Sequence, residues 1–503
     1  MKYSNPILPG FFPDPSICKH EDTYYMVNST FQYFPGVTLS ESKDLINWKQ
    51  IGCVLTRESQ LPLMSAGDSG GIFAPTIRCN EGRFYMVTTN VSSLGNFYVW
   101  TDDIHGEWSD PIQVEQDGID PSFYFEDGIC YFMSNGTDDD GNGGIVQCEI
   151  DIKTGKKLTK SKCIWKGNGG RYLEGPHLYK INGTYYLLAA EGGTEYGHMI
   201  ILAKGETPYG PFESAPNNPI LTNRNLGGYE IQGCGHGDLI EDADGNWWMV
   251  HLAFRQIDRW RMYHTTGRET YLVPVSFDKD GWITVGEDGT TRLEVETDRI
   301  PDTVKQVKRT NYTFEDTALG VEWSLIRNAC RSDYELLNDS FSLKGNQSRL
   351  SDDMASPTFI GIRQYEMTGT ISCIVEVADQ EAGITLYMDH SHHYDLAVQR
   401  TELGMNVIKR IRIGDVETIQ ECVHIKEENN LPVKLQIICS PQAYSFKAVC
   451  KEKEYEFGQN QSKYLSTEVA EGFTGVLIGL YAQSVDKACE IPAIFRNFNY
   501  KTV

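Results

Sequence analysis

The sequence lacks a long hydrophobic run. The opening segment Met1–Gly10 (MKYSNPILPG) has no stretch of roughly 7–15 apolar residues behind a basic end, so it does not resemble a secretory signal. No later segment is long and apolar enough to predict a transmembrane helix. We therefore expect a cytoplasmic protein.

Basic residues are scarce relative to acidic ones. The 503 residues include 45 Lys and Arg against 69 Asp and Glu, a formal net charge of −24. Binding to nucleic acids needs clusters of basic side chains that displace counterions, and anionic membranes repel an acidic surface. These partners are not expected, whereas a neutral small-molecule substrate is compatible with this composition.

Cysteines close together in the sequence are also lacking. There are thirteen cysteines, and the nearest two, Cys439 and Cys450, are eleven positions apart. The absence of any CxxC pair argues against a zinc ribbon and a thioredoxin-like motif. Cysteines within apolar segments, such as Cys130, Cys148 and Cys373, are typical of small buried side chains in a reducing compartment.

Helical periodicity is almost absent, and a repeat occupies the first half of the chain. Five segments share a turn-forming residue, a spacer, a pair of mostly aromatic residues and then apolar residues. They are Asp22–Tyr25, Gly82–Tyr85, Gly128–Tyr131, Gly183–Tyr186 and Gly245–Trp248. Their last residues are separated by 60, 46, 55 and 62 positions. The turn residues and the aromatic residues after them predict β-hairpins.

A second position of the repeat precedes each of those last residues by ten. It is occupied by Pro15, Pro75, Pro121, Pro176 and Asp238. Proline cannot donate to a β-ladder, so each unit is predicted to begin with a strand opened by proline. Five units of roughly four strands predict an all-β, five-bladed β-propeller over residues 1–295. A long β-sandwich is the alternative, but a constant offset of ten in five units argues against it.

The composition changes after the repeats. Residues 296–311 are polar and charged and predict a linker. From Tyr312 onward, short alternating segments resume without the five-fold pattern and predict a β-sandwich over 312–503. Its predicted strands include Ile371–Val377, Gly383–Met388, Lys434–Ile438 and Val476–Tyr481.

Acidic residues precede the first strands of three units. Asp14 and Asp120 lie directly before blade prolines, and Glu174 lies two residues before another. The corresponding places in the other units hold Phe73 and His236. In a propeller the first strands line the central channel, so we expect these side chains to meet at one end of it.

Converging carboxylates provide the chemistry of acetal hydrolysis. Because like charges repel, the pKa of at least one of the three acids should rise. The site would then hold a protonated acid for the leaving oxygen and an ionised base for water. The third acid could hold the general acid in place and tune its pKa.

Further residues are candidates for binding a sugar. Phe31 and Phe73 could stack on a pyranose ring, although single aromatic residues more often belong to a core. Arg268 could bind hydroxyl groups or pair with Glu269. His236 could orient a carboxylate or bind a metal ion.

Several segments together resemble glycoside hydrolase family 43, and in particular its two-domain β-xylosidases, some of which also release α-L-arabinofuranose. The resemblance covers nearly the whole chain. It rests on Asn5–Ser16 (NPILPGFFPDPS), Gly70–Pro75, Gly118–Ser122 and Glu174–Leu178, and in the second domain on Leu319–Trp323 and Phe473–Gly475.

The resemblance implies an inverting, exo-acting hydrolase with a concanavalin-like second domain. It implies that Asp14 is the general base, Glu174 the general acid and Asp120 the residue that orients the acid and modulates its pKa. No cofactor is required for this chemistry.

The resemblance also implies how the rest of the pocket is built. Arg268 would bind the substrate, and His236 would lie below the site, near a divalent ion such as calcium in some members. A loop of the sandwich would close part of the pocket, with Phe473 as the candidate. Phe73 stands where these xylosidases usually carry Trp, which bears on the shape of the subsite.

We therefore expect release of terminal xylose from β-1,4-xylo-oligosaccharides. An α-L-arabinofuranosidase with the same machinery and a non-catalytic sugar-binding propeller are the alternatives. A retaining fructosidase-like propeller fits less well, because Asp14 lies in Phe-Pro-Asp-Pro rather than in an Asn-Asp-Pro-Asn-Gly motif. The sandwich could bind carbohydrate by itself, but an integral domain is favoured, and homo-oligomerisation is left open.

Overall fold

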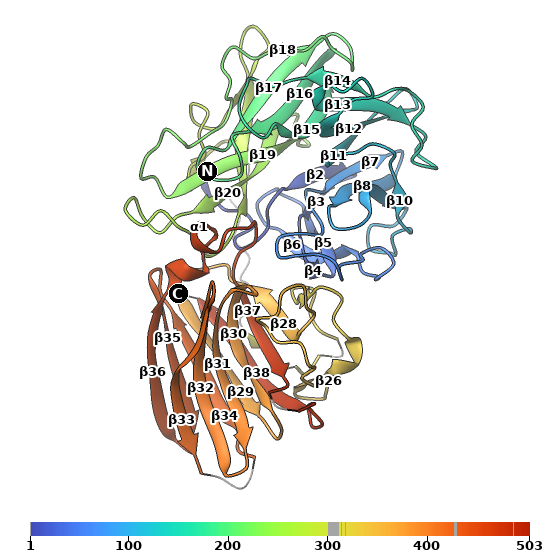
Figure 1. Ribbon diagram of the computed structural model, residues 1–503. Coiled ribbons are helices and arrows are strands. Elements are labelled where there is room, and N and C mark those ends of the chain that lie inside the picture. The colour runs from blue at the N-terminus through green and yellow to red at the C-terminus, as the bar shows by residue number, and fades with distance from the viewer. Residues whose placement is uncertain are drawn as a thin grey trace.

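The structure is a computed structural model that describes residues 2–299, 311–312, 314–316, 318–426, 430–485 and 487–502. Two domains built of β-strands lie end to end (Figure 1). The described helices are short: η1 (Arg331–Asp333), η2 (Ser462–Leu465) and α1 (Thr467–Ala470). None of the helices in these ranges is long and apolar enough to cross a membrane.

The first domain contains five antiparallel sheets of four strands each. Blade one is β2 (Ser16–His20), β3 (Thr23–Asn28), β5 (Gly36–Ser42) and β6 (Lys49–Leu55). Blade two is β7 (Thr76–Asn80), β8 (Arg83–Asn90), β9 (Gly95–Thr101) and β10 (Ile112–Gln113). Blade three is β11 (Ile119–Glu126), β12 (Ile129–Thr137), β13 (Gly143–Ile150) and β14 (Lys162–Trp165). Blade four is β15 (Glu174–Ile181), β16 (Thr184–Glu191), β17 (Met199–Gly205) and β18 (Glu213–Ser214). Blade five is β19 (Ile231–Glu241), β20 (Trp247–Arg255), β21 (Glu269–Phe277) and β22 (Ile283–Val285).

The five sheets form a closed ring, which confirms the predicted propeller. The first strands β2, β7, β11, β15 and β19 contact one another in this order, and β19 contacts β2 again. The N-terminal segment also contacts the last blade and helps to close the ring: β1 (Lys2–Ser4) pairs with β23 (Glu294–Glu296), and Leu8 forms a bridge with Thr270 of blade five.

The prolines of the repeat occupy two kinds of position. Pro15 and Pro75 directly precede β2 and β7, as predicted. Pro121 and Pro176 instead lie within β11 and β15, where the pairing with the next strand shifts register. A β-bulge leaves its extra residue outside the regular hydrogen-bond ladder. A proline at the bulge therefore needs no N–H group and fits inside the strand.

The second domain is a sandwich of two antiparallel sheets. One sheet contains β26 (Tyr334–Leu336), β27 (Phe341–Leu343), β38 (Ala493–Thr502), β29 (Gly369–Glu376), β34 (Val433–Cys439), β35 (Ala443–Cys450) and β36 (Lys453–Gln461), with β24 (Asn311–Tyr312) paired to β38. The other contains β28 (Thr358–Arg363), β37 (Leu477–Gln483), β30 (Glu381–Asp389), β31 (His392–Thr401), β32 (Gly404–Ile413) and β33 (Val416–Ile425).

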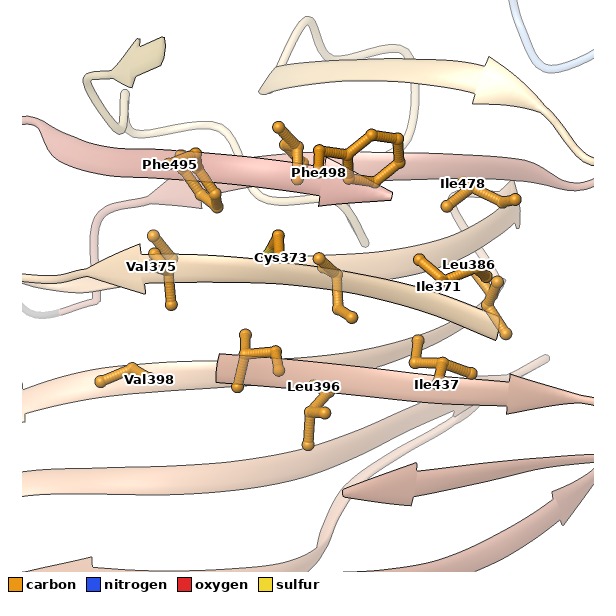
Figure 2. Packing of buried hydrophobic residues seen from close by; sticks show 14 of the residues in the cluster. Ile371, Cys373, Val375, Leu386, Leu396, Val398, Ile437, Ile478, Phe495 and Phe498 are labelled. Carbon is orange, nitrogen blue, oxygen red and sulfur yellow. The ribbon is translucent and has the colours of Figure 1, made fainter. Parts of the chain in front are cut away.

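The core of the sandwich lies between its sheets (Figure 2). Buried residues alternate with more exposed ones along β29, so Ile371, Cys373 and Val375 all face the core. They pack with residues of the opposite sheet such as Leu386 and Leu396. The strands predicted at residues 371–377, 383–388, 434–438 and 476–481 are thus confirmed as β29, β30, β34 and β37, except that Val377 and Val476 each lie one residue outside the observed strand.

The two domains share structure at their contact. The short strand β25 (Leu325–Ile326) belongs by sequence to the second domain, which begins near Tyr312. It nevertheless pairs with β4 (Tyr33–Phe34) of the first domain. Phe11 and Phe359 belong to one buried cluster that spans the contact. Most of the predicted linker, residues 300–310, lies outside the described residues, so the predicted division into 1–295, 296–311 and 312–503 stays a prediction.

A buried ion pair joins four blades near the propeller axis. Asp238 is fully buried and accepts hydrogen bonds from Arg78 Nη1 at 2.8 Å, Arg78 Nη2 at 3.1 Å, Ser16 Oγ at 2.6 Å and the Tyr179 hydroxyl. Arg78 holds the pKa of Asp238 well below its ordinary value, despite the opposing effect of burial.

Asp238→Asn should destabilise the propeller by about 3–5 kcal/mol, because it leaves the Arg78 guanidinium without a charged partner in the interior. Urea unfolding monitored by tryptophan fluorescence measures this loss. Asp102→Asn is the control, since Asp102 pairs with Arg83 on the exposed surface. Equal stability of the two variants would contradict the structural role of the Asp238 pair.

Candidate active site

A pocket of about 680 Å³ lies between one end of the propeller channel and the sandwich. All eight residues predicted for the site line this pocket: Asp14, Asp120, Glu174, Arg268, Phe31, Phe73, His236 and Phe473. The structure therefore brings together residues that are up to 459 positions apart (473 − 14).

Unusual backbone geometry presents the polar side chains to the pocket. Asp14, Asp120 and His236 have φ angles of 50°, 55° and 45°, a region that residues other than glycine rarely adopt. Asp120 and His236 lie at the bulges of β11 and β19. A bulge re-aims a side chain that a regular strand would direct elsewhere.

Glu174 reaches the pocket because a glycine follows it. Gly175 has a φ of 59°, and a Cβ atom there would lie 2.9 Å from Nδ1 of His236. Any larger residue would displace the imidazole ring. Gly175 thus lets the backbone next to Glu174 pack closely against the His236 ring.

Asp14 is buried but remains the most acidic of the three. Arg268 Nη1 donates to Asp14 Oδ1 at 3.1 Å, and the Ser29 hydroxyl donates to Asp14 Oδ2. Burial by itself would raise the pKa of Asp14, but the nearby Arg268, His236 and the hydrogen bond from Ser29 outweigh it and lower the pKa below its ordinary value.

The pKa values of Asp120 and Glu174 are shifted upward, in contrast to that of Asp14. Burial raises the pKa of both groups above their ordinary values, and the charge of Glu174 raises that of Asp120 further. The charge of Asp14 also raises the pKa of Glu174, whereas Arg268 lowers it. The pocket therefore combines an ionised carboxylate at Asp14 with carboxyl groups that hold protons more tightly.

Arg268 lies in the loop before β21, the third strand of blade five. Besides Asp14, its guanidinium donates to Thr194 Oγ1 at 2.7 Å and to the Phe473 carbonyl at 3.3 Å. The alternative pairing with Glu269 does not occur, because Glu269 is bound by Arg255 at 2.8 Å. Arg268 thus connects the general-base candidate to the sandwich loop.

Three phenylalanine rings form an apolar wall. The ring centroids of Phe31 and Phe73 are 5.5 Å apart, and those of Phe31 and Phe473 are 5.7 Å apart. The guanidinium carbon of Arg268 lies 5.6 Å from both Phe31 and Phe473. This wall offers apolar area to a sugar ring beside the charged groups.

The sandwich loop approaches the propeller through paired glycines. A Cβ on Gly267 would lie 3.0 Å from Cα of Gly475, so neither backbone leaves room for a side chain. The Val476 N–H donates to the Thr265 carbonyl at 2.9 Å, and the Phe473 N–H donates to Ser69 Oγ at 2.8 Å. These contacts confirm that a sandwich loop closes part of the pocket.

Other pocket residues were missed by sequence reasoning. They are Thr194, Tyr196 and His198 between β16 and β17, His264 before β21, and Glu468 on α1. His264 Nδ1 lies 2.9 Å from Glu468 Oε1, and neither ring nitrogen of the buried His198 has a partner among the described residues. Gly192 and Gly193 could have indicated a long loop in blade four, but not that this loop extends toward the pocket.

The predicted metal ligand His236 has few ligating neighbours. Its Nδ1 lies 3.9 Å from Asp120 Oδ2. Calcium takes about six to eight oxygen ligands, and the described side chains form no group of three potential ligands at His236. Such a group occurs only at Asp68, Asp389 and His390 in these ranges, where Arg327 pairs with Asp68. The side chains around His236 alone do not fit a calcium cage.

Two protein-family models match the chain over most of its length. The model for glycosyl hydrolases family 43 matches residues 3–283, and that for the β-xylosidase C-terminal concanavalin A-like domain matches residues 311–501. The chain belongs to glycosyl hydrolase family 43. The predicted family is thereby confirmed, and so is an enzyme that hydrolyses glycosidic bonds.

Individual family 43 relatives align over almost the whole chain. A non-reducing end α-L-arabinofuranosidase from Bacteroides ovatus is 37% identical and covers 99% of this chain and 94% of its own. A β-xylosidase from Bacillus subtilis is 31% identical over 100% of both chains. The solved structure of a xylan β-1,4-xylosidase from Bacillus halodurans has a TM-score of 0.92, 31% identity and 99% coverage of each chain.

Arg268→Met should move the acidic limb of the pH–rate profile to higher pH. Arg268 lowers the pKa of Asp14, so without it the carboxylate takes up a proton at a higher pH. The profile of kcat/KM for an aryl glycoside measures the shift. Arg83→Met, which alters an exposed arginine, should leave the limb in place. An unmoved limb in Arg268→Met would refute the electrostatic coupling.

Proposed function

We propose that this family 43 enzyme removes terminal xylose from β-1,4-xylo-oligosaccharides with inversion at the anomeric carbon. The observation that carries the proposal is the split among three buried carboxyl groups, one with a lowered pKa and two with raised pKa values. Closure of the pocket by the Phe473 loop suits an exo-acting enzyme, because it admits the end of a sugar chain rather than its interior.

Asp14 and Glu174 would divide the proton transfers. Asp14 takes a proton from water as the water oxygen attacks the anomeric carbon. Glu174 gives its proton to the glycosidic oxygen as the bond to that carbon breaks on the opposite face. Inversion by this route requires the two carboxyl groups to stand about 6.5–9.5 Å apart, with the water between them.

Asp120 would keep the general acid in its working state. Burial and the charge of Glu174 raise the pKa of Asp120, so ionisation of Glu174 favours the protonated form of Asp120. Arg268 would hold Asp14 in its ionised form and donate to sugar hydroxyl groups with N–H groups that face the pocket. Phe31, Phe73 and Phe473 would cover the apolar face of the sugar.

An α-L-arabinofuranosidase is the second candidate. The relative from Bacteroides ovatus carries that name, and the Butyrivibrio fibrisolvens relative, 38% identical over 99% of both chains, is named xylosidase/arabinosidase. The two pentoses present similar hydroxyl groups, so a pocket distinguishes them weakly. Phe73, in place of the usual Trp, is the residue that alters the subsite.

A cytoplasmic location stays a prediction, a structural divalent cation near His236 stays a hypothesis, and homo-oligomerisation stays open. Waters would have to supply most of the ligands of such a cation, because among the described residues Asp120 is the acidic side chain that pairs with His236.

Asp14→Asn and Glu174→Gln should each lower kcat/KM by about 10²–10⁴-fold, since each removes one proton transfer. The Glu174 variant should retain more activity on a 2,4-dinitrophenyl glycoside than on a methoxyphenyl glycoside, because the better leaving group needs less protonation. The Asp14 variant should lose activity equally on both. Near-normal rates in both variants, with unchanged circular dichroism, would end the assignment.

A comparison of p-nitrophenyl β-xyloside with p-nitrophenyl α-L-arabinofuranoside tests the substrate. We expect a higher kcat/KM on the xyloside, and a higher value on the arabinofuranoside would favour the second candidate. The same assays with and without EDTA test the cation. Loss of activity on chelation, restored by calcium, would support a bound ion, and unchanged rates and thermal stability would refute it.

A further inference from the structure

A second cavity, of about 530 Å³, lies between the domains and shares no lining residue with the catalytic pocket. The N-terminal segment and residues 46–50 form its propeller side. Its sandwich side is formed by Tyr312, Val321, Glu322, Ile362, Arg363 and Tyr365. Its volume is in the range of small-molecule sites in proteins.

Arg363, the last residue of β28, contributes a buried positive charge to this cavity. Its exposed fraction is 7%. The guanidinium Nε donates to the Phe11 carbonyl at 2.7 Å, and the guanidinium carbon lies 4.7 Å from the ring centroid of Phe12. No carboxylate within the described ranges lies close enough to pair with it, and burial lowers the pKa of Arg363 to about 10.

The other buried arginines show how unusual this is. Arg268, Arg327 and Arg410 are equally buried, and each pairs with a carboxylate, at 3.1 Å, 3.0 Å and 2.7 Å respectively. A buried guanidinium is ordinarily compensated in this way, because its desolvation is otherwise unfavourable. Within the described part of the chain, the two terminal nitrogens of Arg363 have no hydrogen-bond acceptor.

The walls of the cavity define the body of a matching ligand. Five aromatic rings lie among the aliphatic side chains and prolines of these walls: Tyr3, Phe12, Trp48, Tyr312 and Tyr365. Such rings favour a flat or ring-shaped molecule. Lys49 adds positive charge at the rim and Glu322 opposes it, whereas Lys2 is paired with Glu294 at 3.5 Å. A net positive lining is notable in a protein whose formal net charge is −24.

We propose that this cavity binds a small organic carboxylate carried on a single ring. Its carboxylate would accept two hydrogen bonds from the terminal nitrogens of Arg363, the planar pairing that guanidinium groups favour. Its ring would pack against the aromatic walls. The carboxylate would thereby supply the counter-charge that Arg363 lacks within the chain.

Calorimetry on the full chain tests the proposal with D-glucuronate and benzoate, a sugar acid and an aromatic acid. D-glucose and benzamide are the uncharged controls. We expect at least one acid to bind with a Kd of about 1 mM or tighter, and its uncharged control to bind at least about tenfold more weakly. Saturating xylose should leave this binding unchanged, because the catalytic pocket is separate. Binding of glucuronate alone would identify a sugar acid, and of benzoate alone an aromatic acid.

Variants locate the binding. Arg363→Gln should weaken it by at least about tenfold. Two rim variants give opposite expectations without touching the interior: Lys49→Glu should weaken binding and Glu322→Gln should strengthen it, each by about two- to fivefold. Hydrolysis of an aryl glycoside should be unchanged in both rim variants. The proposal would be overturned if neither acid binds at about 10 mM, or if the wild type and both rim variants bind with equal affinity.

Discussion

Repulsion among three carboxyl groups in one buried pocket is the constraint on which the rest of the site depends. Asp14, Asp120 and Glu174 are buried close together, so burial and mutual repulsion disfavour ionisation of all three at once. Arg268 Nη1 lies 3.1 Å from Asp14 Oδ1, and its positive charge stabilises the ionised form of Asp14. One group therefore keeps its charge, while the other two hold protons to higher pH, which is the division of roles that acid–base hydrolysis needs.

The propeller suits this task because each blade begins at the same axis. The bulges in β11, β15 and β19 turn side chains at the start of these strands toward the pocket. The left-handed backbone at Asp14 and Asp120 is accommodated because the surrounding strands fix it. The Asp238–Arg78 pair holds the inner strands together below the acids. The sandwich completes the pocket by pressing Gly475 against Gly267.

Much of the fold and of the site could be predicted from the sequence, because both follow from a repeat. The offset between the prolines and the aromatic pairs fixed the number of blades, and the position of the acids in that repeat indicated that they converge. Thr194, His198 and Glu468 could not be predicted in this way, since they lie on loops and on α1, outside the repeating positions. The pairing of β25 with the propeller also could not be predicted, because a strand of two residues has too short a sequence pattern to identify its partner strand.

The stereochemistry of the first product tests the division of labour between Asp14 and Glu174 most directly. Proton NMR of p-nitrophenyl β-xyloside hydrolysis, recorded before the sugar mutarotates, separates the two anomers of the xylose that is released. Water activated by Asp14 attacks the face opposite the leaving group, so α-xylose should appear first and β-xylose later. Initial appearance of β-xylose would mean that a carboxylate attacks the sugar itself, and would contradict the account.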